Sequence, residues 1–390
     1  MSPTEHDVDF AVIGLGALGS ATAYELAARG QQVVGFEQFE LGHHRGASHD
    51  TSRILRRSYH TPAYVQLAGE AYDDWDLLSA AAGEPLVTIT GGVDLFPPDP
   101  AIPMADYVDS MDACGVPYDV LTPAQVADRW PRVRLPDGGQ AIYQADTGMV
   151  HAARTVSALQ RLASRHGAEL RPGVSARVVG AGPDGVELDT GSGPLRCRRV
   201  IVTADAWTDD VIAGLGVHLP LTVTQEQVTY FEPDDAEAFE PGRFPVWIWM
   251  DEPSFYGFPT YGAAEIKAGQ DVGGAITTAA ERSFEPEPAN LRQLTDFMAR
   301  TFPGSAERVG RTVTCLYTLT PDRDFVMSPL TDHPEVIVGL GAGHGFKFTP
   351  TLGRILADLA VDGTTTSDIG AFGLDRAAMT DPDFPPSWLV

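Results

Sequence analysis

Three glycines close to the N-terminus have the spacing of a loop that binds a diphosphate. Gly14, Gly16 and Gly19 follow a short apolar strand pattern and precede a helix pattern with one apolar face. In such a loop the first glycine allows a tight turn, the second lets the backbone approach the pyrophosphate, and the third lets the helix pack on the strand. The diphosphate then lies at the positive end of the helix dipole. The spacing predicts a dinucleotide site but does not choose between NAD and FAD.

A carboxylate completes this unit. Glu37 ends the second predicted strand, 18 positions after Gly19. An acid at this place accepts hydrogen bonds from ribose hydroxyls and would repel a 2′-phosphate. Strand, glycine loop, helix, strand and acid together make one βαβ unit of roughly 30 residues, which is more specific than the three glycines alone.

Three further clusters resemble the sarcosine oxidase and N-methyltryptophan oxidase family of FAD-dependent amine oxidases. They read SHDTSRILR at 48–56, YGFPTYG at 256–262 with Lys267 after it, and TCLYTLTPD at 314–322 with GHGFK at 343–347. Their order and spacing match the family from Phe10 to about residue 365. The resemblance therefore covers nearly the whole chain, and it implies FAD as the cofactor and a fold like that of D-amino-acid oxidase.

The resemblance gives Cys315 a specific role. In this family the matching cysteine is joined through its sulfur to the 8α-methyl group of FAD, which implies a covalent flavin here. By residue type alone, Cys315 could instead be a small buried apolar side chain, as free cysteines often are. Its neighbours at 314–318 favour the covalent link. Cys114 and Cys197 lack such a context and are expected to be structural.

Four cations and a histidine receive functional roles from the same resemblance. Arg56 and Lys347 match the pair that holds the substrate carboxylate, a planar fork and a point charge that together form an anion clamp. Lys267 matches the lysine that helps O2 accept electrons. A fixed cation about 4 Å from nascent superoxide is worth roughly 4 kcal/mol at an effective dielectric of about 20. Arg53 and His49 match groups beside the flavin ring, so Lys267, Arg53 and His49 are the expected catalytic residues. Without this context, Lys267 would be a surface lysine.

The remaining contacts divide between substrate and cofactor. Tyr256 and Tyr317 resemble aromatic walls of the substrate pocket, although core packing stays open for both. The predicted cofactor contacts, besides Gly14, Gly16, Gly19, Glu37 and Cys315, are Ser48, Ser52, Gly343, His344, Gly345 and Lys347. We expect Thr349 to cap the following helix and Pro350 to be its first residue. Its N-terminus could stabilise the anionic N1–C2=O edge of reduced flavin. An ordinary loop is the alternative.

The sequence departs from the family pattern at three aspartates. Asp271 stands where sarcosine oxidases commonly have a histidine, and Asp50 and Asp205 replace common glycines. If Asp271 faces the pocket, a second carboxylate could select a substrate with an additional amine or hydroxyl group. We therefore expect modest sarcosine turnover at best. The alternative is a solvated acid in a turn.

The implied reaction is oxidation of a small secondary or N-methyl amino acid. A hydride passes to flavin N5, the product is an imine, and O2 is reduced to H2O2. Two other classes share features with this prediction: a flavin dehydrogenase that uses another acceptor, and a flavoprotein without catalytic activity. An NAD-linked dehydrogenase would not explain Cys315 or the loop at 343–347. No cluster of metal ligands is visible, and we expect no metal.

The elements that position these residues alternate along the chain. The pattern predicts strands at 9–13, 32–36, 176–179, 185–188, 199–203 and 336–340, and helices at 63–81, 153–166, 287–301 and 350–361. Residues 218–265 are rich in aromatic and β-branched residues, as in an antiparallel sheet. We expect an α/β fold, α+β overall, with a discontinuous Rossmann-like FAD-binding domain and an inserted antiparallel-sheet substrate domain. The expected ranges are 1–88, 146–220 and 312–385 for the first, and 89–145 and 221–311 for the second.

Composition limits the possible partners. The 390 residues carry a formal charge of −26, which should repel nucleic acid and anionic membranes. No apolar run is long enough to span a bilayer, and the N-terminus lacks the features of a signal peptide. Three widely spaced cysteines favour the reducing cytoplasm. We expect a cytoplasmic monomer whose partners are a small amine or amino acid and O2.

Overall fold

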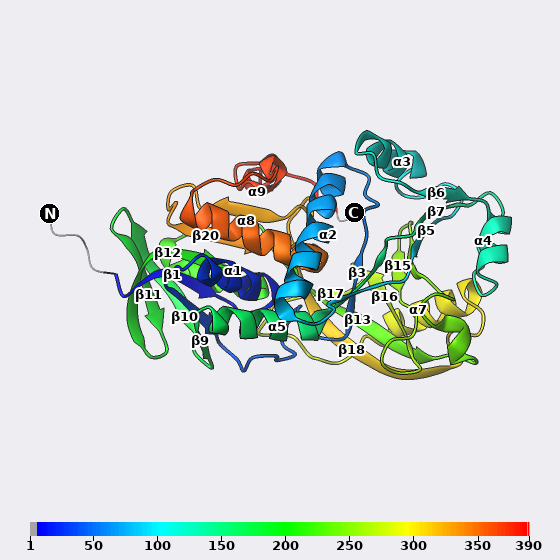
Figure 1. The fold of residues 1–390 in the computed structure, drawn as a ribbon, viewed down its shortest axis with the longest axis horizontal. Coiled ribbons are helices and arrows are strands. Elements are labelled where there is room, and N and C mark those ends of the chain that lie inside the picture. The colour runs from blue at the N-terminus through cyan, green and yellow to red at the C-terminus, as the bar shows by residue number, and fades with distance from the viewer. Residues whose placement is uncertain (1–5, 388, 390) are drawn as a thin grey trace.

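Three β-sheets and the helices packed on them make up the described part of the chain (Figure 1). The structure, a computed structural model, describes residues 6–387 and 389. The first sheet lies toward the left of Figure 1 and the second toward the right, with helix α2 (Pro62–Ala82) in the middle of the view. Among the described helices, none is both long and apolar enough to cross a membrane.

The first sheet has a parallel centre. Its eight strands are β1 (Val8–Ile13), β2 (Val33–Glu37), β9 (Glu169–Pro172), β10 (Ala176–Gly182), β11 (Gly185–Thr190), β12 (Gly193–Val202), β19 (Val326–Pro329) and β20 (Val336–Leu340). β1 pairs in parallel with β2 on one side and β12 on the other, and β9 and β20 extend the parallel part. β10 and β11 join β12 as antiparallel strands, and β19 pairs antiparallel with β20.

Alternate residues of β1 enter two separate apolar cores. Phe10 and Val12 pack toward the helices α1 (Ala17–Ala28), α5 (Ala152–Arg165) and α8 (Thr349–Val361). Ala11 and Ile13 pack on the opposite face, with residues of β10 and β11. This alternation is the period-two pattern of a strand that is covered on both faces. The result is a rigid β1–α1 connection at the carboxyl edge of the parallel strands.

The second sheet is larger and mixed. Its nine strands are β5 (Gly92–Phe96), β6 (Asp119–Leu121), β7 (Gln140–Gln144), β13 (Thr222–Glu232), β14 (Val246–Trp249), β15 (Ser254–Gly257), β16 (Ile266–Asp271), β17 (Ala275–Thr277) and β18 (Arg308–Leu319). Helix α7 (Pro288–Thr301) packs on it through Leu294, Phe297 and Met298. The pairs are antiparallel except for β5–β14, which is parallel. The expected antiparallel sheet is thus present, with one parallel pair between strands from distant parts of the chain.

A small third sheet contains one of the functional clusters. It consists of β3 (Ser52–Leu55), β8 (Gly148–His151) and β4 (Val87–Ile89), all antiparallel. The sequence pattern did not predict this sheet. The other short helices are α3 (Met104–Ala113), α4 (Pro123–Arg129), α6 (Thr208–Ile212) and α9 (Ala377–Thr380).

The predicted fold class is confirmed. The helices expected at 63–81, 153–166 and 350–361 agree with α2, α5 and α8 to within one residue at each end. The expected domain limit at residue 312 falls inside β18, which pairs with β13 over most of its length. The division into two domains remains a proposal.

Candidate active site

One large cavity connects the glycine turn with the second sheet. Its volume is about 1310 Å³, larger than a pocket for a single small ligand. Its lining comes from the β1–α1 turn, the segment 41–50, strand β15 and the loop 341–347. It therefore has room for a dinucleotide and a small substrate together.

The first and third glycines cannot be replaced without displacing backbone atoms. Gly14 has φ +94°, and a Cβ there would lie 2.6 Å from the carbonyl oxygen of Thr203. A Cβ on Gly19 would lie 1.8 Å from the carbonyl oxygen of Gly14. The loop is thus folded tightly against β12 and against the first turn of α1. These contacts account physically for the glycines that the sequence pattern identified.

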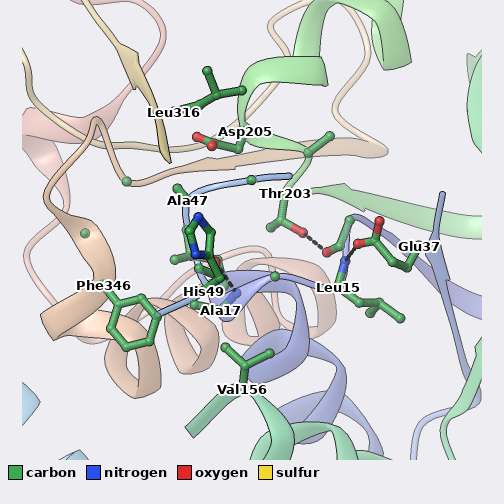
Figure 2. Close-up of a pocket in the computed structure, with 18 of the residues that line it drawn as sticks. Leu15, Ala17, Glu37, Ala47, His49, Val156, Thr203, Asp205, Leu316 and Phe346 are labelled. Carbon is green, nitrogen blue, oxygen red and sulfur yellow. Dashed lines mark hydrogen bonds between the residues drawn. The ribbon is translucent and has the colours of Figure 1, made fainter. Parts of the chain in front are cut away.

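Glu37 and Ser48 border this end of the cavity, and both already accept backbone hydrogen bonds. One oxygen of Glu37 accepts from the N–H of Leu15 at 3.1 Å, as Figure 2 shows, and the other accepts from the N–H of Phe39 at 3.1 Å. The Ser48 hydroxyl accepts from the N–H of Ala17 at 2.9 Å. Ser48 therefore occupies one of the free donors at the start of α1 and keeps its own O–H for another partner.

Cys315 and three cations form one electrostatic cluster. Cys315 lies on β18, is half-buried, and interacts electrostatically with Arg53, Arg282 and Lys267. Burial raises the pKa of its thiol to about 11, although these cations oppose that shift. Arg53 is held by the carbonyl oxygens of Ser52, Ala47 and His49 at 2.8 to 2.9 Å. The thiol and the predicted ring-side cations are thus neighbours in space.

Lys267 is deeply buried on β16 and bound on two sides. Its Nζ donates to the carbonyl oxygen of Ser52 at 2.9 Å and lies 2.6 Å from Oδ2 of Asp50. Burial and the nearby Arg53 lower the pKa of Lys267 to about 8, although Asp50 opposes this. The pKa of His49 falls to about 4, mainly through burial and next through Arg53. His49 is therefore neutral near pH 7.

The loop before α8 faces the cavity, but not as an open helix end. Gly343 has φ +79°, and a Cβ there would lie 2.7 Å from the ring of Tyr317. Residues 345–348 form a 3₁₀ turn that continues directly into α8. Thr349 is the first helical residue and donates to the carbonyl oxygen of Phe346, so the prediction that it caps α8 is wrong. The preceding turn begins the helix earlier than the sequence suggested.

One ring nitrogen of His344, Nδ1, is a hydrogen-bond acceptor without a partner among the described residues. Its Nε2 lies 3.0 Å from the carbonyl oxygen of Arg323, and burial, followed by Arg323 and Lys347, lowers its pKa well below the usual value. Because a carbonyl oxygen only accepts, Nε2 carries the proton of the neutral ring, and Nδ1 is left as an acceptor. Nδ1 is buried and has no hydrogen-bond partner among the described residues.

The two cations predicted to hold the substrate carboxylate both line the cavity. Arg56 and Lys347 are both lining residues, and Asp94 lies 3.7 Å from Arg56. The described residues place no carboxylate within ion-pair distance of Lys347, whose Nζ donates to the carbonyl oxygen of His344 at 3.3 Å. Burial, followed by Arg56, lowers the pKa of Lys347 well below its usual value. An anion bound here would offset both the lost hydration of Lys347 and its repulsion by Arg56.

Asp271 also lines the cavity, but its carboxylate is already engaged. Both oxygens accept from Arg323, at 2.8 and 2.7 Å, and Arg323 is 1% exposed. Burial opposes ionisation, yet Arg323 lowers the pKa of Asp271, so it stays charged. The reading of Asp271 as a solvated turn acid is therefore wrong. Asp271 is paired and faces the cavity.

Sequence reasoning missed Arg323 and Asp94. Arg323 follows directly on the cluster at 314–322, and Asp94 is the one carboxylate in the apolar strand β5. The sequence did contain a signal for Asp94, because an acid within an apolar strand is expected to be buried and a buried acid requires a partner. The partners of Asp94 are Arg56 and the hydroxyl of Ser58.

Most of the predicted site residues meet at this cavity. The lining includes Gly14, Gly16, Glu37, Ser48, His49, Arg53, Arg56, Tyr256, Asp271, Tyr317, Gly343, His344, Gly345 and Lys347. Gly19, Ser52, Lys267 and Cys315 lie behind the lining rather than in it. Each is one contact or one residue from it: Gly19 touches Gly14, Ser52 precedes Arg53, Lys267 binds Asp50 and Cys315 precedes Leu316.

Comparison with known proteins gives the family. The model of the FAD-dependent oxidoreductases of the D-amino-acid-oxidase type matches residues 9–359. The chain belongs to this family. It is 33% identical to monomeric sarcosine oxidase of Streptomyces avermitilis, over 97% of this chain and 99% of that protein. It is 28% identical to N-methyl-L-tryptophan oxidase of Salmonella arizonae, over 94% of this chain and 98% of that protein. The resemblance on which the sequence analysis rested is confirmed.

A solved structure agrees with this family membership. NikD, described as an unusual amino acid oxidase essential for nikkomycin biosynthesis, superimposes with a TM-score of 0.84 at 26% identity. The match covers 94% of this chain and 97% of NikD. Glycine oxidase from Geobacillus kaustophilus, at 22% identity and a TM-score of 0.78, shares the fold.

The residues of the cavity fit the FAD that this family uses. The tight turn at Gly14 and the carboxylate of Glu37 suit a dinucleotide at one end. Buried polar atoms without a partner among the described residues, His49 Nε2, Asp205 Oδ2 and His344 Nδ1, border the same space. Figure 2 shows His49 and Asp205 among the residues that line the cavity, as are Phe346 and Val156. Such atoms call for a polar ligand, because an unpartnered buried polar group is costly.

Proposed function

We propose that this chain oxidises a small secondary or N-methyl amino acid and passes the electrons to O2. The observation that carries the proposal is the position of two cations, buried Arg56 and half-buried Lys347, in the same cavity as the dinucleotide turn. Buried cations without full compensation bind anions, and a carboxylate is the anion of an amino acid. The names of the similar sarcosine and N-methyltryptophan oxidases support the same substrate class.

The charges at the substrate end suit one carboxylate. Three cations, Arg56, Arg323 and Lys347, face two acids, Asp94 and Asp271. One positive charge is left when all five are ionised, and a substrate carboxylate would balance it. We propose that Tyr256 and Tyr317 form the pocket walls and that Asp271, held by Arg323, contributes shape and charge rather than a free acceptor. Modest turnover of sarcosine remains our expectation.

The cofactor would lie between this clamp and the glycine turn. When bound, FAD would accept a hydride equivalent from the carbon next to the substrate nitrogen and reduce O2 to H2O2. The clamp would hold the substrate carboxylate so that the reacting carbon stays in one place. The neutral form of the amine should react, because its lone pair must be free to form the imine. His49, Ser48, Ser52 and the loop 343–345 would hold the cofactor.

We also propose a covalent bond between Cys315 and FAD. The support is the match to the family motif and the cationic surroundings of the thiol, Arg53, Arg282 and Lys267. These cations favour the thiolate, which is the reactive form of cysteine. Burial acts against it. Forming the bond would remove the thiol proton, one proton of the 8α-methyl group and two electrons, and O2 would accept the electrons and both protons to give H2O2.

A dehydrogenase is the second candidate, and one observation favours it. Lys267, the proposed oxygen-activating cation, already has the carboxylate of Asp50 2.6 Å away. The carboxylate offsets part of the positive field that Lys267 would exert on nascent superoxide, even though it also favours the protonated lysine, so another acceptor could compete with O2. A flavin dehydrogenase would be reduced by the amine but would make little peroxide.

Domain division, oligomeric state and location complete the proposal. We propose the discontinuous FAD domain and the substrate domain with the limits given above, since the first sheet lies wholly within the former. A monomer is supported by the name of the sarcosine oxidase relative. A cytoplasmic location is supported by the three cysteines, none of which forms a disulfide within the described residues.

One experiment tests the proposed function. The purified yellow protein is mixed without oxygen with a panel of amines and amino acids, and the loss of flavin absorbance is followed. Air is then admitted and peroxide is measured. Bleaching by secondary or N-methyl amino acids, followed by stoichiometric peroxide, is the expected result. Bleaching without peroxide would select the dehydrogenase, and no bleaching by any amine would reject both.

A further inference from the structure

The chain contains two lysines, and both lie at the site. Of the 27 basic residues, Lys267 and Lys347 are lysines and the other 25 are arginines. Lys267 is 4% exposed. Lysine differs from arginine because its ammonium group can lose its proton when buried. Both lysines of the chain are thus at the site, and the groups that control their protonation affect the chemistry of the site.

Asp50 is placed against Lys267 at the cost of an unfavourable backbone. Its φ is +82°, a region that side chains other than glycine rarely occupy. Its Oδ2 lies 2.6 Å from Nζ of Lys267, and its Oδ1 accepts from the hydroxyl of Tyr230 at 2.5 Å. Tyr230 also contacts the hydroxyl of Thr51 at 2.8 Å. Several contacts therefore hold this strained residue in one position, which indicates a functional constraint.

Apart from Asp50, the two strongest influences on Lys267 oppose its charge, while the carbonyl oxygen of Ser52 accepts a hydrogen bond from it. Arg53 repels it, and burial removes its hydration. His49 faces the same cluster and is neutral near pH 7, while the thiol of Cys315 adds a weak favourable interaction. The ring of Phe258 lies 5.2 Å from Nζ. Asp50 is the charged acid in direct contact with Lys267, with its own pKa lowered to about 2, although burial opposes that shift.

We propose that Asp50 is the positioning residue that keeps Lys267 protonated and fixed beside the cofactor space, and that it thereby sets the pH range of the reaction with O2. This inference rests on the proposed function. In the balanced reaction, O2 gains two electrons and two protons to give H2O2. The reduced cofactor supplies a hydride equivalent, and solvent supplies the other proton. The first electron makes superoxide, an anion that needs the ammonium form of Lys267 nearby.

The presence of two lysines allows a direct measurement. The FAD-loaded enzyme is labelled with lysine carrying ¹³C at the ε-carbon, and both signals are titrated by NMR. A Lys267→Met variant assigns them. In Asp50→Asn we expect the pKa of Lys267 to fall by about one to three pH units, the usual effect of one contacting opposite charge. The signal of Lys347, whose charged neighbours do not include Asp50, should titrate as before.

Two further variants separate charge from backbone strain. Asp50→Gly removes the carboxylate and also relieves the positive φ, so it should lower the pKa of Lys267 as much as Asp50→Asn does. Asp99→Asn makes the same change at an exposed aspartate that also has a positive φ, 55°, and should leave the pKa of Lys267 unchanged. An unchanged pKa of Lys267 in both Asp50 variants would overturn the proposal.

The oxygen reaction supplies the second readout. Enzyme reduced by light is mixed with O2 at a series of pH values, so that no amine substrate is required. We expect the rate to decline above about pH 8 in the natural enzyme, and the midpoint to move down in Asp50→Asn by the shift seen by NMR. If the pKa of Lys267 moves but the oxygen rate does not follow, the role of Asp50 holds and the oxygen role of Lys267 in the proposed function fails.

Discussion

At the scale of single residues, the cations of the site differ in whether an acid already faces them. Arg56 faces Asp94, Arg323 faces Asp271 and Lys267 faces Asp50, whereas the described residues offer Lys347 no such acid. Lys347 is also the cation whose protonation burial and Arg56 suppress most clearly. It therefore has the most to gain from a bound carboxylate.

This difference predicts proton uptake on binding. A carboxylate raises the pKa of Lys347 toward its usual value, so binding takes up a proton at any pH between the free and bound pKa values. Affinity falls as the pH rises through the pKa of the free enzyme. Calorimetry with propionate, in buffers of different ionisation enthalpy, should count this proton. Lys347→Met should abolish the uptake and weaken binding about 10- to 100-fold, the effect of one hydrogen bond to a charged group.

The control is the neighbouring cation Arg57. It pairs with Asp146 at 3.3 Å and does not line the cavity. Arg57→Met should leave both affinity and proton uptake unchanged. Equal losses in the two variants would show that general positive charge, rather than Lys347, attracts the carboxylate.

Cys315 gives a prediction about the cofactor. Cys315→Ser should release its flavin into the supernatant when the protein is precipitated with trichloroacetic acid, whereas the natural protein should give a yellow pellet. Cys197→Ser is the matched control, since Cys197 is fully buried between strands of the first sheet. A colourless pellet from the natural protein would remove the covalent bond from the account.

Asp205 predicts a pH-dependent stability. Burial raises its pKa to about 6, and its φ is +48°. The pKa of Asp205 is higher in the folded state than in the unfolded state, so its protonated form favours folding. This contribution to the free energy of unfolding is complete below about pH 4 and is lost as the pH rises through about 6. Asp205→Asn should therefore stabilise the cofactor-free protein at pH 8 by up to about 3 kcal/mol relative to its effect at pH 4. Thermal unfolding of both proteins at the two pH values measures this, and equal shifts would contradict it.

Residue pairs were the least predictable part of the site. The motifs supplied Arg56, Lys347 and Asp271 because residue type and spacing are local. Arg323 was missed, since its bidentate contact with Asp271 joins β16 to a turn about 50 positions later. Asp271 is paired rather than solvated because of this distant arginine, and the sequence pattern around Asp271 does not include it.

At the scale of elements, the turn between β1 and α1 depends on small side chains. A Cβ on Gly19 would meet backbone, while a Cβ on Gly69, in the middle of α2, would meet nothing within 4 Å outside its own helix. Gly19→Ala should lower FAD content and destabilise the protein by about 1 to 3 kcal/mol, as overpacking does. Gly69→Ala should stabilise it by about 0.5 to 1 kcal/mol through helix propensity. Bound flavin and chemical unfolding report both effects, and similar results for the two variants would contradict this account of the turn.

The elements themselves were largely predictable, and the exceptions have physical causes. β1, α1 and β2 follow local rules of periodicity and glycine spacing, and both ends of α2 were placed to within one residue. The start of α8 was placed to within one residue, but its cap was assigned wrongly because residues 345–348 form a 3₁₀ turn that leads directly into the helix. The small sheet of β3, β4 and β8 was missed because its strands are three or four residues long.

At the scale of the whole molecule, the cavity depends on how distant segments meet. The glycine turn, the segment 48–56, strand β18 and the loop 343–347 come from opposite ends of the chain and line or border one space. This arrangement explains how a chain with a charge of −26 could still bind an anionic substrate. The cations are buried or half-buried in the cavity, and charges in such places are screened by salt much less than exposed charges are.

The central claim is that enclosed cations hold the carboxylate of an amine while its neighbouring C–H is oxidised. The most direct test is anaerobic stopped-flow reduction of the bound flavin by a secondary amino acid and by the same amine without its carboxylate. We predict that the amino acid reduces the flavin at least about 100-fold more efficiently at equal concentration, as expected from one or two charge-assisted hydrogen bonds. Equal efficiency for the two compounds would contradict the account.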